Sequence, residues 1–174
     1  SSSVATFSGL GISGLISDTY SITFTATYNG STFTAVQSGI TIGHGVASSL
    51  TLDTAAATVV NATNFGTQPV VKVLDVAGNL VADSTAAVTI AASRTTLGGT
   101  ATVNAVAGVA TFSGLRLTGT VGDVTLTYSS GSLGTTSQIV SLTHGAATQV
   151  SIAVASSLVN DTVFATQPVA TIKD

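Results

Sequence analysis

The residue types that could do chemistry in this chain are aspartate and histidine, and both are sparse. Among 174 residues there are seven aspartates, no glutamate, two histidines and no cysteine. Calcium takes about six to eight oxygen ligands, usually from several carboxylates, whereas a zinc site needs about three or four ligands in one place. The aspartates are Asp18, Asp53, Asp75, Asp83, Asp123, Asp161 and Asp174, and the histidines are His44 and His144. Because the aspartates stand singly and mostly in turn contexts, their spacing predicts no assembled metal centre.

The chain contains all three residue types of a nucleophilic serine, histidine and aspartate triad, including 22 serines. Such a triad is recognised by its setting, for example a Gly-x-Ser-x-Gly turn that exposes the serine between a strand and a helix. No such turn occurs in the sequence. We therefore predict no catalytic residues and no enzyme activity.

Three pairs of similar segments recur along the chain at nearly the same offset. The string "VATFSGL" begins at residues 4 and 109, an offset of 105 residues. The other two pairs are "GHGVASSLTL" at 43–52 with "THGAATQVSI" at 143–152, an offset of 100, and "NFGTQPVVKVLD" at 64–75 with "VFATQPVATIKD" at 163–174, an offset of 99. A near-constant period of this size indicates a tandem array of domains.

The offsets divide the chain into one whole unit and two partial units. Residues 1–46 are expected to form the C-terminal part of one repeat, residues 47–146 a complete repeat, and residues 147–174 the N-terminal strands of the next repeat. On this interpretation the natural polypeptide is longer and both ends fall inside a domain. The alternative is a single domain with degenerate ends, but an isolated half sandwich would leave one face of a sheet uncovered.

The elements that must position these residues are strands, because apolar and polar residues alternate. In "DTYSITFTATY" the aromatic and aliphatic residues from Tyr20 to Tyr28 point to one face, and serine and threonine to the other. In "VVKVLD" and its copy "VATIKD", Val71 and Val73 are predicted to face inward, whereas Lys72 takes the outward register. An intramolecular isopeptide bond would need a core-facing lysine, so none is expected at Lys72.

Further strand signals give about seven strands in roughly a hundred residues, separated by turn signals such as "AGN", "LGG" and "SSG". The further candidates are residues 50–52, 87–92, 100–106, 108–112 and 138–142. Helical spacing is absent, and β-branched residues and glycine dominate. The predicted fold class is all-β, with tandem immunoglobulin-like Greek-key β-sandwiches.

Several segments carry a family resemblance. The sequence "FGTQPVVKVLDVAGNLV", followed by "GGTATVNAVAGVATFSGLRLTG", "GDVTLTYSSG" and "LTHGAAT", resembles the bacterial immunoglobulin-like tandem repeats of large surface and secreted proteins, including the stalks of invasin-like and intimin-like adhesins. The resemblance covers the central unit and both partial units. It implies an extracellular rod, stalk or filament on the cell surface.

The predicted junctions between repeats hold the candidate site residues. His44 and Gly45 occupy the same place as His144 and Gly145, just before the first strand of the next unit. Because the two histidines are a full repeat apart, we expect them to pack or hydrogen-bond at a hinge rather than to bind zinc. Some related arrays bind calcium at such junctions, and Asp53 is the best candidate ligand. Otherwise no cofactor is expected.

Composition narrows the possible partners. The net charge is −3 and only four residues are basic, so no stripe could neutralise the phosphates of a nucleic acid. No apolar run approaches the roughly 18 residues of a membrane-spanning helix, so membrane insertion is not expected. Charged residues make up 6% of the chain, and the 22 serines and 31 threonines give a nearly uncharged surface with poorly guarded strand edges. Such a surface favours self-association.

The leading prediction is a structural extracellular repeat protein that forms a cell-surface filament, sheath or stalk with copies of itself. The alternative is an adhesin, in which loops such as "TATYNGSTF" bind a glycan or a host protein. A third class, an accessory module of a carbohydrate-active enzyme, would require a catalytic domain elsewhere in the gene.

Overall fold

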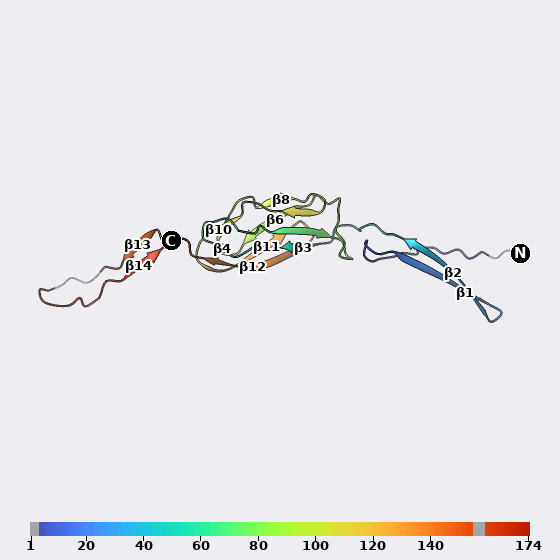
Figure 1. Ribbon diagram of the computed structural model, residues 1–174, viewed down its shortest axis with the longest axis horizontal. Coiled ribbons are helices and arrows are strands. Elements are labelled where there is room, and N and C mark those ends of the chain that lie inside the picture. Colours follow the sequence, from blue (N-terminus) through green and yellow to red (C-terminus); the bar gives the residue numbers. More distant parts are fainter. Residues whose placement is uncertain (1–3, 155–158) are drawn as a thin grey trace.

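The chain is all-β, as the sequence predicted. The computed structural model describes residues 4–154 and 159–174, and it contains no helix within those residues. A central β-sandwich lies between two hairpins, one toward each terminus, so that the molecule is elongated (Figure 1). None of the described residues forms a helix that could cross a membrane.

The larger sheet of the sandwich has the order β4-β12-β11-β6-β8. Its strands are β4 (Val59–Val60), β6 (Ala87–Ala92), β8 (Thr102–Asn104), β11 (Gly122–Ser129) and β12 (Thr135–Thr143). Neighbours are antiparallel except for β4, which runs parallel to β12 and pairs Val59 with Leu142. The first and last parts of the central unit are therefore hydrogen-bonded side by side.

The smaller sheet has the order β3-β5-β9, and all its neighbours are antiparallel. Its strands are β3 (Ser49–Thr54), β5 (Val70–Leu74) and β9 (Val109–Thr111), and a separate pair joins β7 (Thr96–Gly98) to β10 (Arg116–Thr118). The chain passes from β3 in the smaller sheet to β4 in the larger one, returns with β5 and crosses again to β6, and it ends with the β11–β12 hairpin in the larger sheet. This is the strand order of an immunoglobulin-like Greek-key sandwich.

The core lies between the two sheets of the central unit. Its buried apolar residues all fall between Leu50 and Leu142. Val71 and Val73 are completely buried, which confirms their predicted inward register. The rings of Phe112, beyond the end of β9, and Tyr128, on β11, meet at 5.9 Å across the sandwich. Aromatic contacts of this kind contribute about 0.5–1.5 kcal/mol beyond the apolar area that they bury.

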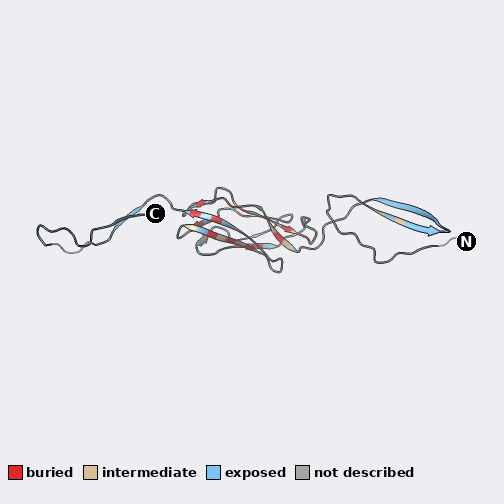
Figure 2. Cartoon of the chain, turned by 90° about the horizontal axis from the view of Figure 1, so that it is seen from below, coloured by how far each residue is buried: buried red, intermediate tan, exposed pale blue. Residues whose placement is uncertain are grey.

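The two outer hairpins are β1 (Tyr20–Tyr28) with β2 (Ser31–Ile40), and β13 (Gln149–Ile152) with β14 (Ala170–Lys173). The first is closed by Asn29 and Gly30, whose φ angles of 50° and 79° fit the type I′ turn that matches the twist of a hairpin. Most of their residues are exposed, in contrast to the buried strands of the sandwich (Figure 2).

Candidate functional site at the repeat junctions

The first junction is held by a hydrogen bond between a backbone amide and a carboxylate. The N–H of Gly45 donates to Oδ2 of Asp75 at 2.7 Å. Asp75 directly follows β5 and begins the "DVAGN" turn, in which its Oδ1 accepts from the backbone N–H groups of Ala77 and Asn79 at 2.9 and 2.8 Å. This is the local bonding that favours aspartate in turns. The same carboxylate therefore shapes the turn and binds the incoming chain.

Asn79 extends this contact to the loop before β1, which the sequence predicts to belong to a preceding repeat. Its side-chain Nδ2 donates to Oδ2 of Asp75 at 3.0 Å and to the carbonyl oxygen of Gly14 at 2.9 Å. Its Oδ1 accepts from the backbone N–H of Ile16 at 2.9 Å. We call the hydrogen-bonded group of Gly45, Asp75 and Asn79 the first clasp. Through Gly45 it binds the segment between β2 and β3, and through Asn79 the loop before β1, to the turn after β5.

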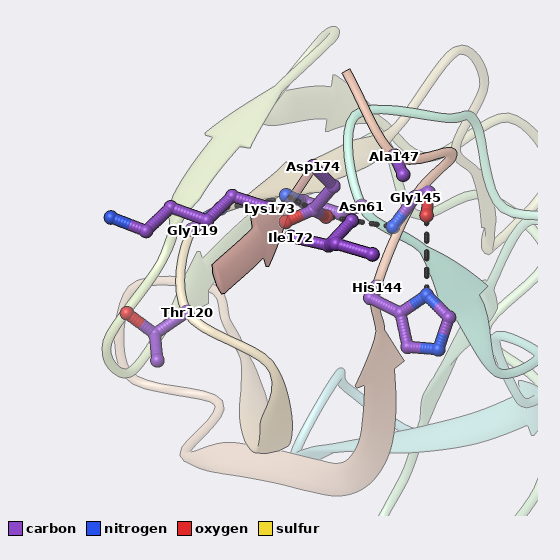
Figure 3. Close-up of a pocket in the computed structure, with 9 residues that line it drawn as sticks. All are labelled: Asn61, Gly119, Thr120, His144, Gly145, Ala147, Ile172, Lys173 and Asp174. Atoms are coloured by element: carbon purple, nitrogen blue, oxygen red, sulfur yellow. Dashed lines mark hydrogen bonds between the residues drawn. The ribbon is translucent and has the colours of Figure 1, made fainter. Parts of the chain in front are cut away.

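The second junction repeats the central bond of the clasp. The N–H of Gly145 donates to Oδ2 of Asp174 at 2.7 Å. Asn61 supplies the amide here: its Nδ2 donates to Asp174 Oδ2 at 3.0 Å, and its Oδ1 accepts from the N–H of Gly119 at 3.0 Å. Gly119 is the repeat counterpart of Gly14. Gly145, Asp174 and Asn61 form the second clasp, which borders an open pocket of about 770 Å³ (Figure 3).

Both clasp carboxylates are stabilised as anions. The N–H of Gly45, followed by the side-chain amide of Asn79, lowers the pKa of Asp75 from 3.8 to about 2. The N–H of Gly145 and the side chain of Asn61 likewise lower the pKa of Asp174. Hydrogen bonds donated to a carboxylate favour its charged form. Each clasp is therefore a charged acceptor at neutral pH, and hydrogen bonds to charged groups are the stronger kind.

The two predicted junction histidines lie beside the clasps. In each case Nδ1 bonds to the carbonyl oxygen of the following glycine, at 3.0 Å for His44 and 3.1 Å for His144 (Figure 3). A carbonyl oxygen can only accept, so Nδ1 carries the proton. Nε2 of His44 also lies 3.6 Å from Oδ1 of Asp83. Each histidine thus helps to shape the turn that presents the glycine N–H. The two histidines lie in different junctions and do not contact each other.

Asp53, the calcium candidate, lies on β3 and faces a lysine. Its Oδ1 is 2.5 Å from Nζ of Lys72 on the neighbouring strand β5, and both side chains are partly exposed. In residues 4–154 and 159–174, no three histidine, aspartate or glutamate side chains gather as a metal-binding group. Calcium binding at Asp53 stays a prediction.

Sequence reasoning selected the junction glycines and histidines but missed the carboxylates that bind the glycines. Asp75 was interpreted as a turn residue only, and Asn79 and Asn61 were not singled out. A usable signal was present: Gly45 and Gly145 lie 100 residues apart, and Asp75 and Asp174 lie 99 apart. The glycine and the aspartate that it binds are therefore 30 residues apart in the first junction and 29 apart in the second.

Comparison with known proteins gives no family for this chain. No family model and no curated protein matches it. Among solved structures, a β-glucuronidase from Parabacteroides merdae is similar over 69% of this chain at 14% identity, with a TM-score of 0.44. A β-glycosidase from Bacteroides vulgatus is similar over 71% at 14% identity, with a TM-score of 0.45. The matched regions make up only 16% and 17% of those two enzymes.

Proposed function

We propose that this protein is a structural extracellular repeat protein whose immunoglobulin-like units form a filament, sheath or stalk on a bacterial cell surface. It acts mechanically and has no enzyme activity. The observation that carries the proposal is the recurrence of the clasp bond, a glycine N–H donating to an aspartate carboxylate at 2.7 Å in both junctions. A bond that recurs at each junction would orient every unit on the next in the same way.

The order in which the chain passes through the strands of the central sandwich suits a protein under tension. The chain enters through β3 and β4 and leaves through β12, and β4 runs parallel to β12. The N–H of Asn61 bonds to the carbonyl oxygen of Thr143 at 2.8 Å beside this pair. Pulling the two ends apart therefore slides β4 against β12 and loads several hydrogen bonds at once. Strands that are sheared along their length withstand a larger force than strands whose hydrogen bonds break one at a time.

The surface of the central sandwich supports association between copies. Its long strand β12 exposes Ile139, which is 70% accessible, and the loops expose Val76 and Val106 at 90% and 77%. Only 6% of the chain is charged. Charge on edges and faces is what normally keeps sandwiches apart.

Negative-stain electron microscopy of the purified chain at several concentrations, with and without a calcium chelator, tests this function. We expect fibres longer than one molecule, which persist in chelator because hydrogen bonds rather than a metal hold the clasps. Fibres that dissolve in chelator would assign the junction to calcium. Separate thin rods at every concentration would remove the filament and leave a stalk.

An adhesin is the second candidate, favoured by the tip of the β1–β2 hairpin. Tyr28 is 72% exposed and Phe33 is 60% exposed, on the same face of this hairpin. Exposed aromatic rings offer large apolar contact surfaces, to which the tyrosine hydroxyl adds a polar group, and such surfaces are typical of recognition sites. Glycan-array binding that is lost in Tyr28→Ala and Phe33→Ala, but kept in Thr32→Ala on the opposite face, would establish the adhesin.

A further inference from the structure

A glutamine occupies a core-facing position of β12. The core-facing residues of this strand alternate, and two of them, Val140 and Leu142, are 3% and 1% exposed. Gln138 continues the same register and pairs with Leu126, whose side chain is completely buried. An amide that is partly withdrawn from water is costly unless both of its polar ends are hydrogen-bonded. The partners of Gln138 therefore indicate why a polar residue stands at this position.

Both polar ends of Gln138 bind a single residue, Ala56. The backbone N–H of Ala56 donates to Oε1 of Gln138 at 2.9 Å, and Nε2 of Gln138 donates to the carbonyl oxygen of Ala56 at 3.1 Å. Ala56 is 9% exposed and lies outside the strands, so its backbone groups need partners other than a regular ladder. The side chain of Gln138 thus takes the place of the backbone hydrogen bonds of a strand pair.

This contact lies where the entering chain crosses from one sheet to the other. The pairing of β3 with β5 ends at Thr54, and the pairing of β4 with β12 begins with Val59 and Leu142. Residues 55–58 connect the two strands. Gln138 therefore extends the contact between the entering segment and β12 beyond the short β4–β12 pair.

We propose that Gln138 is a tension latch, whose two bonds to Ala56 set the force at which the central sandwich unfolds. This inference rests on the proposed function and names the residue that limits the load. Ala56 precedes β4 in the chain, so a force applied at residue 47 reaches the latch before it reaches β4. While the latch is closed, it shares the load with the β4–β12 pair. Without it, β4 holds the entering chain on β12 with two residues only.

A second glutamine provides a matched control. Nε2 of Gln68 donates to the carbonyl oxygens of Phe65 and Leu115 at 3.1 and 3.2 Å, and the N–H of Leu115 donates to its Oε1 at 3.0 Å. These bonds also join a side-chain amide to the backbone, but they lie beyond β4 along the chain. Force from residue 47 loads them only after β4 has separated from β12. Gln68→Ala should therefore lower stability without weakening the resistance to shear.

Force spectroscopy of the full-length chain, with handles at residues 47 and 146, tests the latch. At the same constant force, Gln138→Ala should unfold at least about tenfold faster than the wild type, because its lost bonds are among those that must break first. Gln68→Ala should stay within about twofold of the wild type. Urea titrations of both variants measure their loss of unfolding free energy. A purely structural role of Gln138 would change that free energy but leave the unfolding rate under shear like that of Gln68→Ala.

Gln138→Glu tests the bonds without changing the size of the side chain. An ionised carboxylate can accept from the N–H of Ala56 but cannot donate to its carbonyl oxygen, whereas a protonated one can do both. Residues 55–58 carry no charge, and the aspartates of the neighbouring strands, Asp53 and Asp123, are exposed, with Asp53 paired to Lys72.

The Gln138→Glu variant should therefore unfold faster than the wild type at about pH 8 and return toward the wild-type rate as the pH falls below about 4, near the ordinary pKa of glutamate. Each rate is compared with that of the wild type at the same pH. An acceleration that persists unchanged in acid would overturn the latch.

The outcomes separate the latch from the proposed function. The function would survive without the latch if the wild type resists shear more than unzipping of the β11–β12 hairpin but Gln138→Ala and Gln68→Ala unfold equally fast. A wild type that unfolds at the same force in both directions would overturn the latch together with the tension-bearing role.

Discussion

At the scale of single residues, Asp75 connects two parts of the chain that are distant in sequence. It is 4% exposed and accepts hydrogen bonds from the N–H groups of Gly45, Ala77 and Asn79 and from the Asn79 side chain. Protonation would turn one oxygen from an acceptor into a donor that faces other donors. The charged form of Asp75 is therefore the form that the first junction requires.

Acid should loosen the first junction. Because folding lowers the pKa of Asp75 from 3.8 to about 2, its contribution to stability is complete above the unfolded value and is lost as pH falls toward the folded value. Hydrogen exchange of the Gly45 amide should accelerate, relative to its intrinsic rate, between about pH 4 and pH 2. The exposed Gly43 amide serves as the control. Protection of Gly45 that stays constant down to pH 2 would contradict this role.

Substituting the carboxylate should have the same effect at neutral pH. Asp75→Asn places an amide N–H₂ against several donors, so at least one of these donors loses its acceptor. We expect greater bending between the first partial repeat and the sandwich, measured as a broader distance distribution in small-angle X-ray scattering. The matched control is Asp53→Asn, which breaks a partly exposed ion pair with Lys72 worth about 0–1 kcal/mol. Equal effects of the two substitutions would remove Asp75 from the junction.

Tyr128 offers a stabilising change at a single atom. Its ring is buried, burial raises its pKa, and its hydroxyl has no hydrogen-bond partner among the described residues. In the β1–β2 hairpin the matching ring is that of Phe24, which lies 5.2 Å from Phe7, the repeat counterpart of Phe112. Tyr128→Phe should therefore raise the free energy of unfolding by about 1 kcal/mol, since a buried unpaired hydroxyl is removed and the ring contact with Phe112 is kept. A urea titration measures the change, and a clear loss of stability would indicate an unrecognised partner for the hydroxyl.

The local role of residues was predictable, but their distant partners were not. The sequence indicates that Asp75 belongs to a turn, because aspartate bonds the backbone that follows it. Its bond to Gly45 spans 30 residues, and that of Asn79 to Ile16 spans 63. Such pairs depend on how two units meet, which local residue preferences do not encode.

At the scale of elements, the long alternating strands were predictable, and so were the three-residue strands β8 and β9, which lie within the predicted segments 100–106 and 108–112. The predicted segment 87–92 coincides with β6 (Ala87–Ala92), whereas β4, β7 and β10 were missed. These three strands have only two or three residues each. Unless it lies within a longer candidate segment, a strand of so few positions shows no recognisable period of two, and the pairing of these three is imposed by the neighbouring strands.

The turn before β9 depends on one glycine. Gly108 has a φ of +77°, and a Cβ placed there would lie 2.4 Å from the carbonyl oxygen of Val81. Gly108→Ala should lower the free energy of unfolding of the sandwich by about 1–3 kcal/mol, because both the backbone conformation and the close approach become strained. Gly66→Ala is the control, since nothing lies near its Cβ position. Thermal melts of the two variants should differ by several degrees, and equal melting temperatures would exclude this constraint.

At the scale of the whole molecule, the path of the chain through the central unit required the structure. The chain enters the central unit at one end of the sandwich and leaves it at the other (Figure 1). The parallel pairing of β4 with β12 joins the segment through which the chain enters to the segment through which it leaves. The sequence could not reveal this pair, because β4 has only two residues, Val59 and Val60.

Force spectroscopy can test whether this arrangement bears load. Attaching the handles at residues 47 and 146 shears β4 against β12, and the sandwich should unfold in one step at high force. Attaching them at residues 122 and 142, which pair at the open end of the β11–β12 hairpin, instead unzips that hairpin and breaks its hydrogen bonds one after another at lower force. Gly45 and Asp174 lie outside the stretched segment, so neither clasp contributes to these two forces. Unfolding at equal force in both directions would mean that the sandwich is a spacer without directional strength, and the case for a tension-bearing filament would then rest on the junctions alone.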